Sequence, residues 1–316
     1  MSETASSGFA IYTAGLAKNF GSFKAVAGID LRVPQGSVFG FLGPNGSGKT
    51  TTIRMILGLA NISAGDVQLL GYRVPEELSK ALPKVGALVE GPAFYPYLSG
   101  RDNLIRYDSA DLHADPMTRS ERVDAALARV GLTQAAGKKV HAYSLGMKQR
   151  LGIANALLQP RELLVLDEPT NGLDPQGTRE VRNLIRSLAS DGITIFVSSH
   201  LLAEIEQICT HLAVMSRGEI VAQGSIEELS AGHAKVLRII STKPDSAAAL
   251  LLTLGITAFI DGNSLTAELT DQHPAAETII DALVRANVPV RSFTVQAPTL
   301  EDRFVSLTGE GFEVAQ

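Results

Sequence analysis

One stretch of the sequence has the residue types and the spacing needed to bind phosphate. Residues 43–50 read Gly-Pro-Asn-Gly-Ser-Gly-Lys-Thr and match G-x-x-x-x-G-K-S/T, between a predicted strand at 37–42 and a predicted helix at 50–59. Glycines let backbone N–H groups turn toward phosphate oxygens, and the first helical turn adds unpaired donors. In this motif Lys49 reaches the β- and γ-phosphates and the Thr50 hydroxyl ligates Mg²⁺. The predicted nucleotide-binding residues are Gly43, Pro44, Asn45, Gly46, Ser47, Gly48, Lys49, Thr50 and Thr51.

Two carboxylates are placed for the chemistry that such a loop requires. Asp167 and Glu168 directly follow the apolar run 163–166. The carboxyl end of a buried strand faces the same crevice as the phosphate loop. Asp167 suits Mg²⁺, through a water, and Glu168 suits polarising an attacking water. An ordinary acidic turn before Pro169 is the alternative interpretation.

The elements that must position these residues alternate between strands and helices. Short apolar runs occupy 37–42, 85–89, 163–166 and 193–198, and continuous hydrophobicity is typical of parallel strands covered on both faces. Residues of about 99–158 contain helical periodicity and two predicted capping boxes, at 99–102 and 118–121. We therefore predict an α/β fold of the doubly wound kind, with a mixed or parallel sheet and an inserted helical subdomain.

The pattern changes after residue 224. Strand-like and helix-like segments follow in the order strand, helix, strand, strand, helix, strand, which is the ferredoxin-like βαββαβ arrangement. A last short helix is predicted from Thr299. The predicted boundaries are 9–228 for the larger domain and 233–308 for a small C-terminal α+β domain. This second domain could dimerise the chain, regulate it or only cap its core.

Composition excludes several classes of protein. The chain has 316 residues, a net charge of -5 and 45% hydrophobic residues. It lacks the roughly 18 consecutive apolar residues of a membrane-spanning helix, and the charge argues against a nucleic-acid partner. The single cysteine, Cys209, excludes a disulfide within the chain, suits a reducing cytoplasm and is expected in the core.

A third motif identifies a family. Residues 143–150 read Tyr-Ser-Leu-Gly-Met-Lys-Gln-Arg and lie about 95 residues after Lys49. They resemble the signature sequence of ATP-binding-cassette (ABC) ATPases, usually Leu-Ser-Gly-Gly-Gln, with Ser144 and Gly146 retained. The variant looks like the form found in cassettes that export drugs and antibiotics. The resemblance covers about residues 9–224 and implies the fold of a P-loop ABC ATPase with ATP and Mg²⁺ as ligands.

The resemblance also assigns residues outside the phosphate loop. Phe20 falls where the family has an aromatic residue that stacks on adenine, and Asp174 falls in a D-loop-like segment. His200 resembles the switch histidine that contacts the γ-phosphate. Glu90 replaces a glutamine that meets Mg²⁺ and the attacking water, so a carboxylate here would add negative charge beside the phosphates. The aromatic loop at 91–97 is expected to contact a membrane subunit.

These assignments predict a function. The chain would bind and hydrolyse ATP in a dimer of cassettes, either with itself or with another cassette chain, because each ATP would lie between the phosphate loop of one and Ser144 of the other. It would power a separate permease from the cytoplasmic face of the membrane, exporting a drug, antibiotic or lipid-like substrate. The alternative is a soluble ABC ATPase in DNA maintenance or translation. Such proteins usually carry a long coiled coil before the signature, or two cassettes, and this sequence has neither.

Overall fold

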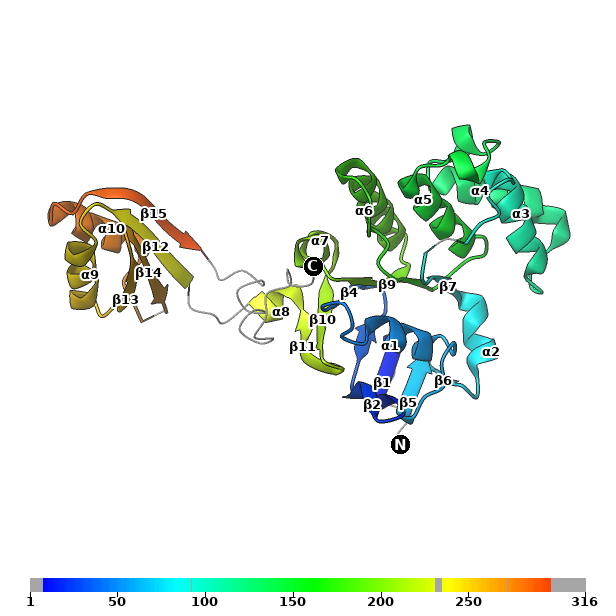
Figure 1. Cartoon of the computed structure of the whole chain (residues 1–316), viewed down its shortest axis with the longest axis horizontal. Helices are drawn as coiled ribbons and strands as arrows, with labels where there is room; N and C mark the ends of the chain where they lie inside the picture. The colour runs from blue at the N-terminus through cyan, green and yellow to red at the C-terminus, as the bar shows by residue number, and fades with distance from the viewer. Residues whose placement is uncertain (1–7, 92, 231–234, 271, 297–316) are drawn as a thin grey trace. The chain divides into compact units, whose positions relative to one another are not determined.

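The computed structural model describes residues 8–91, 93–230, 235–270 and 272–296, so the helix expected from Thr299 lies outside the described residues. The chain divides into two compact units, Met1–Ile226 and Glu227–Gln316 (Figure 1). Among the described residues, no helix has the length and apolarity needed to cross a membrane.

The first unit is built on a six-stranded sheet. Its order is β11 (Glu219–Ser225), β10 (His211–Ser216), β4 (Val38–Leu42), β9 (Thr194–Ser199), β8 (Leu163–Leu166) and β7 (Val85–Leu88). All neighbours from β10 to β7 pair in parallel, and only β11 is antiparallel. Every residue of β4, β8 and β9 is buried, as their unbroken apolar runs predicted. Phe39 and Phe41 both pack on Phe196, with ring centroids 5.8 and 5.4 Å away.

Helices follow the parallel strands and cover the sheet. These are α1 (Lys49–Ile56) after β4, α6 (Pro175–Ser190) after β8 and α7 (Leu202–Ile208) after β9. Helix α6 buries Val181, Ile185 and Leu188, which recur at the spacing of one helical face. The Cys209 thiol lies against β4 at the end of α7, and burial raises its pKa above the ordinary range, as expected of a core cysteine.

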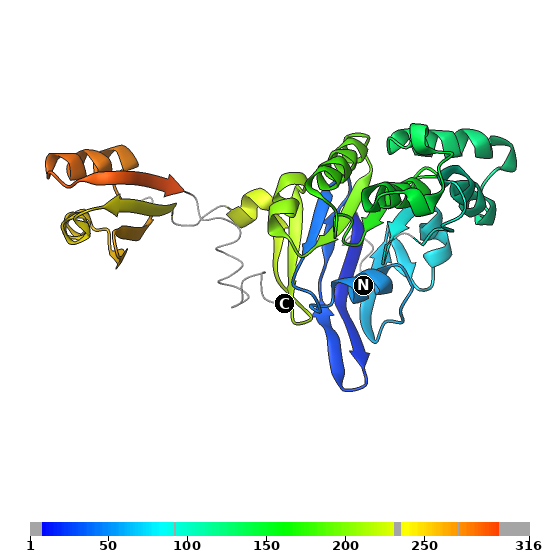
Figure 2. The ribbon, with the colours of Figure 1, turned by 45° about the horizontal axis from the view of Figure 1, so that its top comes forward.

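A second, antiparallel sheet was not foreseen in the alternating pattern. It contains β1 (Phe9–Phe20), β2 (Phe23–Ile29), β3 (Arg32–Pro34), β5 (Ala64–Leu69) and β6 (Tyr72–Val74). Figure 2 shows the long β1–β2 hairpin, in blue, projecting from this unit. Register shifts interrupt the pairing of β1, so its apolar residues do not alternate regularly. The core of both sheets is continuous and includes Ile53 and Ile56 of α1.

The predicted helical subdomain is present between β7 and β8. It consists of α3 (Gly100–Ala110), α4 (Arg119–Arg129) and α5 (Leu145–Ala156). Ser99 caps α3 by accepting the backbone N–H of Asp102, as predicted. The capping box predicted at Thr118 is wrong, because its hydroxyl instead accepts a bond from Arg122 at 2.5 Å and makes no cap of α4.

The second unit contains four strands and two packed helices. After α8 (Ile226–Ser230) come β12 (Lys235–Ser241), α9 (Pro244–Thr253), β13 (Ala258–Asp261), β14 (Ser264–Leu269), α10 (Ala276–Arg285) and β15 (Val290–Gln296). The strand order is β13-β14-β12-β15, and all pairs are antiparallel. Leu237, Leu251, Ile279 and Leu283 form part of its core.

Candidate functional site

The phosphate loop connects β4 to α1 and is closed by its own lysine. The Lys49 side chain is buried, and its Nζ donates to the carbonyls of Gly43 at 2.7 Å and Pro44 at 3.3 Å. A Cβ on Gly43 would lie only 2.3 Å from the Met215 carbonyl, and Gly48 has a φ of 109° at the start of α1. Glycine is therefore required at both positions. The lysine ammonium has three donor hydrogens, and its bonds to these two carbonyls hold the loop in a tight turn. The backbone amides of the loop continue directly into the N-terminus of α1, where free N–H groups attract phosphate.

Asp167 lies at the carboxyl end of β8 and is held from several sides. Its backbone N–H donates to the Leu88 carbonyl at 2.8 Å. Its Oδ2 accepts the Thr50 hydroxyl at 3.0 Å, and its Oδ1 accepts the Ser198 hydroxyl at 2.5 Å. The backbone and carboxylate of Asp167 together thus join three strand ends, β7, β8 and β9, to the first turn of α1. This is the meeting point expected at the carboxyl edge of a parallel sheet.

Glu168 turns back toward the phosphate loop. Its φ is 48°, a left-handed conformation uncommon outside glycine, and its N–H donates to the Ser198 hydroxyl at 2.9 Å. Its Oε1 lies 3.3 Å from Lys49 Nζ, and its Oε2 lies 2.9 Å from His200 Nδ1. A carboxylate accepts only, so His200 carries its hydrogen on Nδ1 in this contact. Unusual backbone geometry held by neighbours is common at functional sites.

The structure therefore brings together Lys49, Thr50, Asp167, Glu168 and His200. The set supplies a cation for phosphate oxygens, two carboxylates and an imidazole at one sheet edge. Its oxygen donors also fit Mg²⁺, since Thr50 and Asp167 present a hydroxyl and a carboxylate in direct contact.

Two oxygens at this edge, one of them paired by charge with Lys49, form no hydrogen bond with the described residues. Ser47 Oγ and Glu168 Oε1 are buried without a hydrogen bond within the described residues. No group of three or more acidic, histidine or cysteine side chains among the described residues is arranged to hold a metal by itself. Mg²⁺ is usually bound by few protein ligands together with waters and substrate phosphates, and Thr50 and Asp167 would be such ligands here.

Phe20 and Glu90 are among the predicted residues that lie outside this set. Phe20 is 56% exposed near the end of the β1–β2 hairpin, and Lys18 Nζ lies 5.0 Å from its ring centroid. Glu90 contacts Arg54 of α1, rather than Thr50 or Asp167. The roles of Phe20 in stacking and of Glu90 in metal binding stay predictions.

The signature residues Ser144 and Gly146 lie at the start of α5, and the D-loop residue Asp174 lies at the start of α6. Ser144 caps α5 by accepting the Met147 N–H at 3.2 Å, and Asp174 caps α6 by accepting the Gly177 N–H at 2.8 Å. A Cβ on Gly146 would find its nearest neighbour, Gly177 Cα, at 3.6 Å. The two helix N-termini are thus neighbours. Neither capping side chain forms a hydrogen bond with the phosphate loop in the part of the chain that is described.

Ser198 contributes to this site although the sequence pattern did not indicate it. It is fully buried at the end of β9, donates to Asp167 and accepts from Glu168, so it fixes both carboxyl-bearing residues. Its position two residues before His200, after an apolar run, was the available signal. Arg54 was also not selected, although it lies four residues after Thr50 on α1.

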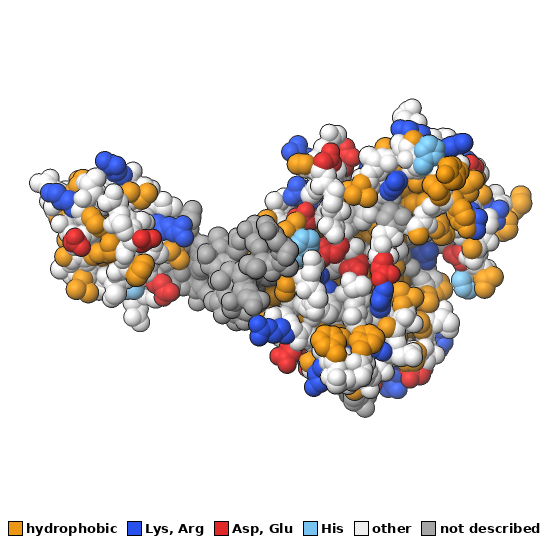
Figure 3. All heavy atoms as spheres, in the orientation of Figure 1, with side chains coloured by type: hydrophobic (Ala, Val, Ile, Leu, Met, Phe, Trp, Pro, Cys, Tyr) orange, Lys and Arg blue, Asp and Glu red, His pale blue; other side chains and the backbone are white. Residues whose placement is uncertain are grey.

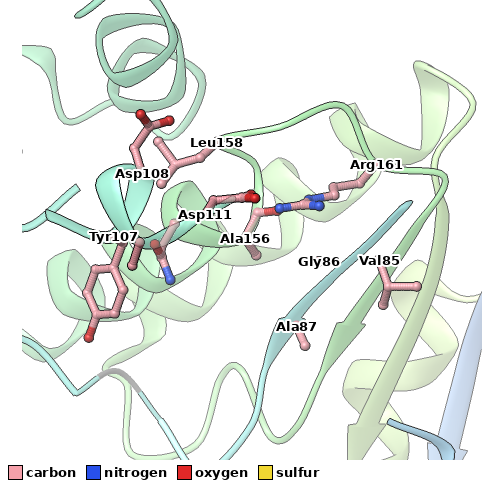
Figure 4. A pocket seen from close by; sticks show the side chains of 11 residues that line it. Val85, Gly86, Ala87, Tyr107, Asp108, Asp111, Ala156, Leu158 and Arg161 are labelled. Carbon is pink, nitrogen blue, oxygen red and sulfur yellow. The ribbon is translucent and has the colours of Figure 1, made fainter. Parts of the chain in front are cut away.

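A separate cavity of about 300 Å³ lies beside β7, between α3 and α5, and shares no residue with the site above (Figure 4). Its lining includes Tyr107, Asp108 and Arg161. Burial opposes the charge of Asp108, but hydrogen bonds from Arg122 and Arg119 outweigh it and hold the pKa of this carboxyl below its ordinary value. Asp108 is therefore a paired structural carboxylate.

Comparison with curated proteins gives relatives that span nearly the whole chain. A family model described as ABC transporter matches residues 26–171. The ABC transporter ATP-binding protein YdbJ of Bacillus subtilis strain 168 is 40% identical, over 94% of this chain and 95% of its own length. The bacitracin transport ATP-binding protein BcrA of Bacillus licheniformis is 38% identical, over 95% and 98%. The daunorubicin/doxorubicin resistance ATP-binding protein DrrA of Streptomyces peucetius is 32% identical, over 95% and 92%.

Solved structures show the same fold. The ADP conformation of MJ1267, an ATP-binding cassette of an ABC transporter, superposes with a TM-score of 0.63 at 26% identity, over 70% of this chain and 92% of that one. CbiO1 of Clostridium perfringens, part of the ABC transporter complex cbiONQ, gives 0.64 at 25% identity, over 78% and 96%. These matches confirm the predicted P-loop fold with mixed sheets. The chain belongs to the ATP-binding proteins of ABC transporters.

Proposed function

We propose that the chain hydrolyses ATP to drive a separate membrane permease that exports an antibiotic-like substrate. The observation that carries this proposal is the position of Glu168, whose carboxylate contacts both Lys49 of the phosphate loop and His200 of β9's carboxyl end. A candidate general base is therefore in contact with both a phosphate-binding cation and an imidazole. This is the arrangement needed to activate water beside a γ-phosphate.

In the proposed reaction, the oxygen of a water forms a bond to the γ-phosphorus, and the bond from that phosphorus to the β–γ bridging oxygen breaks. The Glu168 carboxylate accepts the proton of the water, and ADP and phosphate leave. Lys49 neutralises charge on the transferred group, while His200 holds Glu168 in place through Nδ1. Thr50 and Asp167 would hold Mg²⁺, which neutralises phosphate charge when bound.

We also propose that two cassettes close around ATP. Ser144 begins α5, and the next residue, Leu145, is 49% exposed, so the N-terminus of α5 is open to a second molecule. Helix N-termini attract phosphate through free amides and the helix dipole. A pair related by a twofold axis would form two equivalent sites. Release of the γ-phosphate would then let the pair separate.

The permease contact is assigned to the aromatic loop and the helical subdomain. Tyr95 and Tyr97 are 47% and 76% exposed, and Figure 3 shows hydrophobic side chains gathered over this part of the first unit. Phe94 is instead half-buried against Tyr107, with ring centroids 5.8 Å apart. Exposed aromatic residues are enriched at protein interfaces. The two tyrosines, rather than Phe94, would therefore contact the permease at the cytoplasmic face of the membrane.

Export is supported by the relatives. Two of them are described as acting in bacitracin transport and in resistance to daunorubicin and doxorubicin. We infer a substrate of the antibiotic class, recognised by the permease. The second unit is assigned as an accessory domain of the ferredoxin-like type on its strand and helix order, with the predicted limits 9–228 and 233–308 for the two domains.

The proposal is tested by Glu168→Gln, which removes the base and keeps the side-chain shape. We expect turnover to fall by about 10²–10⁴-fold, the usual contribution of a general base. ATP should still bind, and should now hold a stable dimer, as measured by light scattering after size exclusion. Glu162→Gln, at the opposite end of β8, is the control and should hydrolyse ATP normally. Turnover near wild type in Glu168→Gln would contradict the assignment.

A further inference from the structure

Glu90 and Arg54 form an ion pair at the rim of the phosphate site. Glu90 follows β7 with a φ of 62°, and its carboxylate contacts the Arg54 guanidinium on α1. A non-glycine residue in the left-handed region is uncommon. The backbone here therefore adopts a conformation that places this carboxylate on the last turn of α1.

Both partners are connected to Asp167 by short links. Arg54 lies four residues after Thr50 on α1, so the two share one helix face. Glu90 lies two residues after Leu88. Thr50 donates its hydroxyl to Asp167, and the Leu88 carbonyl accepts the Asp167 N–H. The ion pair therefore lies one helical turn from the residues assigned to Mg²⁺ and phosphate.

The charge of this region explains why such a pair is needed. Asp167 and Glu168 already place two carboxylates beside the phosphate loop, and the Lys49 cation is close to Glu168. ATP adds further negative charge. An unpaired third carboxylate at Glu90 would repel the nucleotide, with an energy that falls with distance and with salt. A guanidinium in contact with Glu90 cancels that charge.

We propose that Arg54 is a positioning residue for ATP binding, which holds the Glu90 carboxylate on α1 and neutralises it. This inference rests on the proposed ATP-binding role of the phosphate loop. It makes a specific prediction about paired substitutions, because the harm done by removing Arg54 should depend on the presence of the Glu90 charge.

The test measures binding of a fluorescent ATP analogue in EDTA, so that no metal takes part. Arg54→Met should weaken binding roughly threefold to tenfold at low salt, and the loss should shrink as ionic strength rises and the Debye length falls from about 10 Å toward 3 Å. Arg54→Lys, which keeps the charge, should bind nearly as wild type. The double variant Arg54→Met/Glu90→Gln should recover wild-type affinity.

A matched control is available in the same unit. Lys84 and Glu162 form an ion pair with side chains 40% and 58% exposed, against 42% and 60% for Arg54 and Glu90. Lys84→Met should leave ATP affinity unchanged. Thermal melting of each variant shows that it is folded.

Two results would overturn the proposal. Wild-type affinity in Arg54→Met would show that the pair has no electrostatic effect on the nucleotide. A double variant as weak as Arg54→Met would show that Arg54 contacts the nucleotide itself, rather than acting through Glu90. Lys49→Ala separates this inference from the proposed function, because unchanged ATP binding in that variant would contradict the phosphate-loop assignment, whatever the Arg54 series shows.

Discussion

The phosphate edge of the sheet and the signature region differ in how their polar groups are satisfied. At the sheet edge, Asp167 and Glu168 receive hydrogen bonds or ion pairs from residues of α1 and β9 and from the residue after β9. In the signature region, the Ser144 hydroxyl accepts the Met147 N–H in the first turn of its own helix, and Leu145 beside it is exposed. The first region is connected within one chain. The second has donors available for another molecule.

In the proposed dimer, the first region binds nucleotide and the second region contacts the nucleotide bound to the other chain. A site whose members hold one another is set by the fold of a single cassette, so it can bind nucleotide before any partner arrives. The N-terminus of α5, beside the exposed Leu145, can bind phosphate only when another chain brings a nucleotide to it. Substitutions in one region should therefore leave the function of the other region intact.

Among substitutions that separate the two regions, the largest effect is expected from Gly146→Asp in the signature. The nearest atom to a Cβ here is 3.6 Å away, and acidic residues are favourable in the first turn of a helix, so the variant should fold. A carboxylate would repel the γ-phosphate of the opposing site. We expect turnover to fall by about 10²–10³-fold, as when an electrostatic contact to the transition state is lost. ATP binding to the monomer should be unchanged.

Gly146→Ala is the control for this variant, because it adds bulk without charge and should keep most of the activity. Equal loss in both variants would show that the position is closed to any side chain, rather than that it faces phosphate. Steady-state hydrolysis and monomer binding are the two measurements.

A middle-sized effect is expected on stability from Asp108→Asn. Asp108 is 1% exposed and pairs with Arg119 and Arg122, whose side chains are 30% and 16% exposed, so its loss leaves two partly exposed guanidinium groups without their carboxylate. We expect unfolding to become easier by about 1–3 kcal/mol, as when hydrogen bonds between charged groups are lost. Asp124→Asn, at an exposed pair with Arg101, should cost less than about 1 kcal/mol. ATP affinity of the folded variants should be unchanged, because the phosphate edge does not depend on this pair.

The same carboxylate gives a pH dependence whose sign is fixed. The pKa of Asp108 in the folded chain is below its ordinary value of 3.8, with hydrogen bonds from the two arginines overcoming the opposing effect of burial. Its contribution is therefore present above that ordinary pKa and is lost as pH falls through the folded value. Denaturant unfolding of wild type and Asp108→Asn should converge as the medium is acidified. A constant difference down to low pH would contradict this.

The smallest effect is expected from Phe20→Ala on the hairpin. Stacking on a base contributes about 1 kcal/mol or more, so ATP should bind about fivefold more weakly. Inorganic tripolyphosphate has no base and should compete equally well in wild type and variant. Phe20→Tyr should keep the affinity, and Phe23→Ala, at the neighbouring exposed ring, should not change it. Normal ATP binding by Phe20→Ala would contradict the proposal that the Phe20 ring stacks on adenine.

The catalytic edge could be predicted because its residues stand at the ends of apolar runs. The phosphate loop, Asp167 and His200 each follow a buried parallel strand, and parallel strands end at one edge. Helical spacing likewise indicated the helical subdomain at about 99–158, and the cap at Ser99 indicated the start of α3. A local sequence pattern was sufficient to predict a site residue when the strand or helix that carries the residue also fixes its position.

The remainder depends on contacts between distant segments, which no local pattern contains. Ser198 looks like part of a buried strand, and its bonds to Asp167 and Glu168 arise only from the order β9-β8. The Arg54–Glu90 pair joins residues 36 positions apart. The antiparallel sheet was missed because bulges break the alternation of β1. The cap expected at Thr118 failed because Arg122 takes the hydroxyl.

In the proposed dimer, each ATP site uses the phosphate loop of one chain and the signature of another. Mixing Lys49→Ala with Gly146→Asp tests this arrangement, since neither variant should hydrolyse ATP alone. A mixed dimer would contain one site with an intact phosphate loop and an intact signature, while its other site carries both defects. ATP hydrolysis should therefore return when the two variants are mixed. A mixture as inactive as its two components would contradict it.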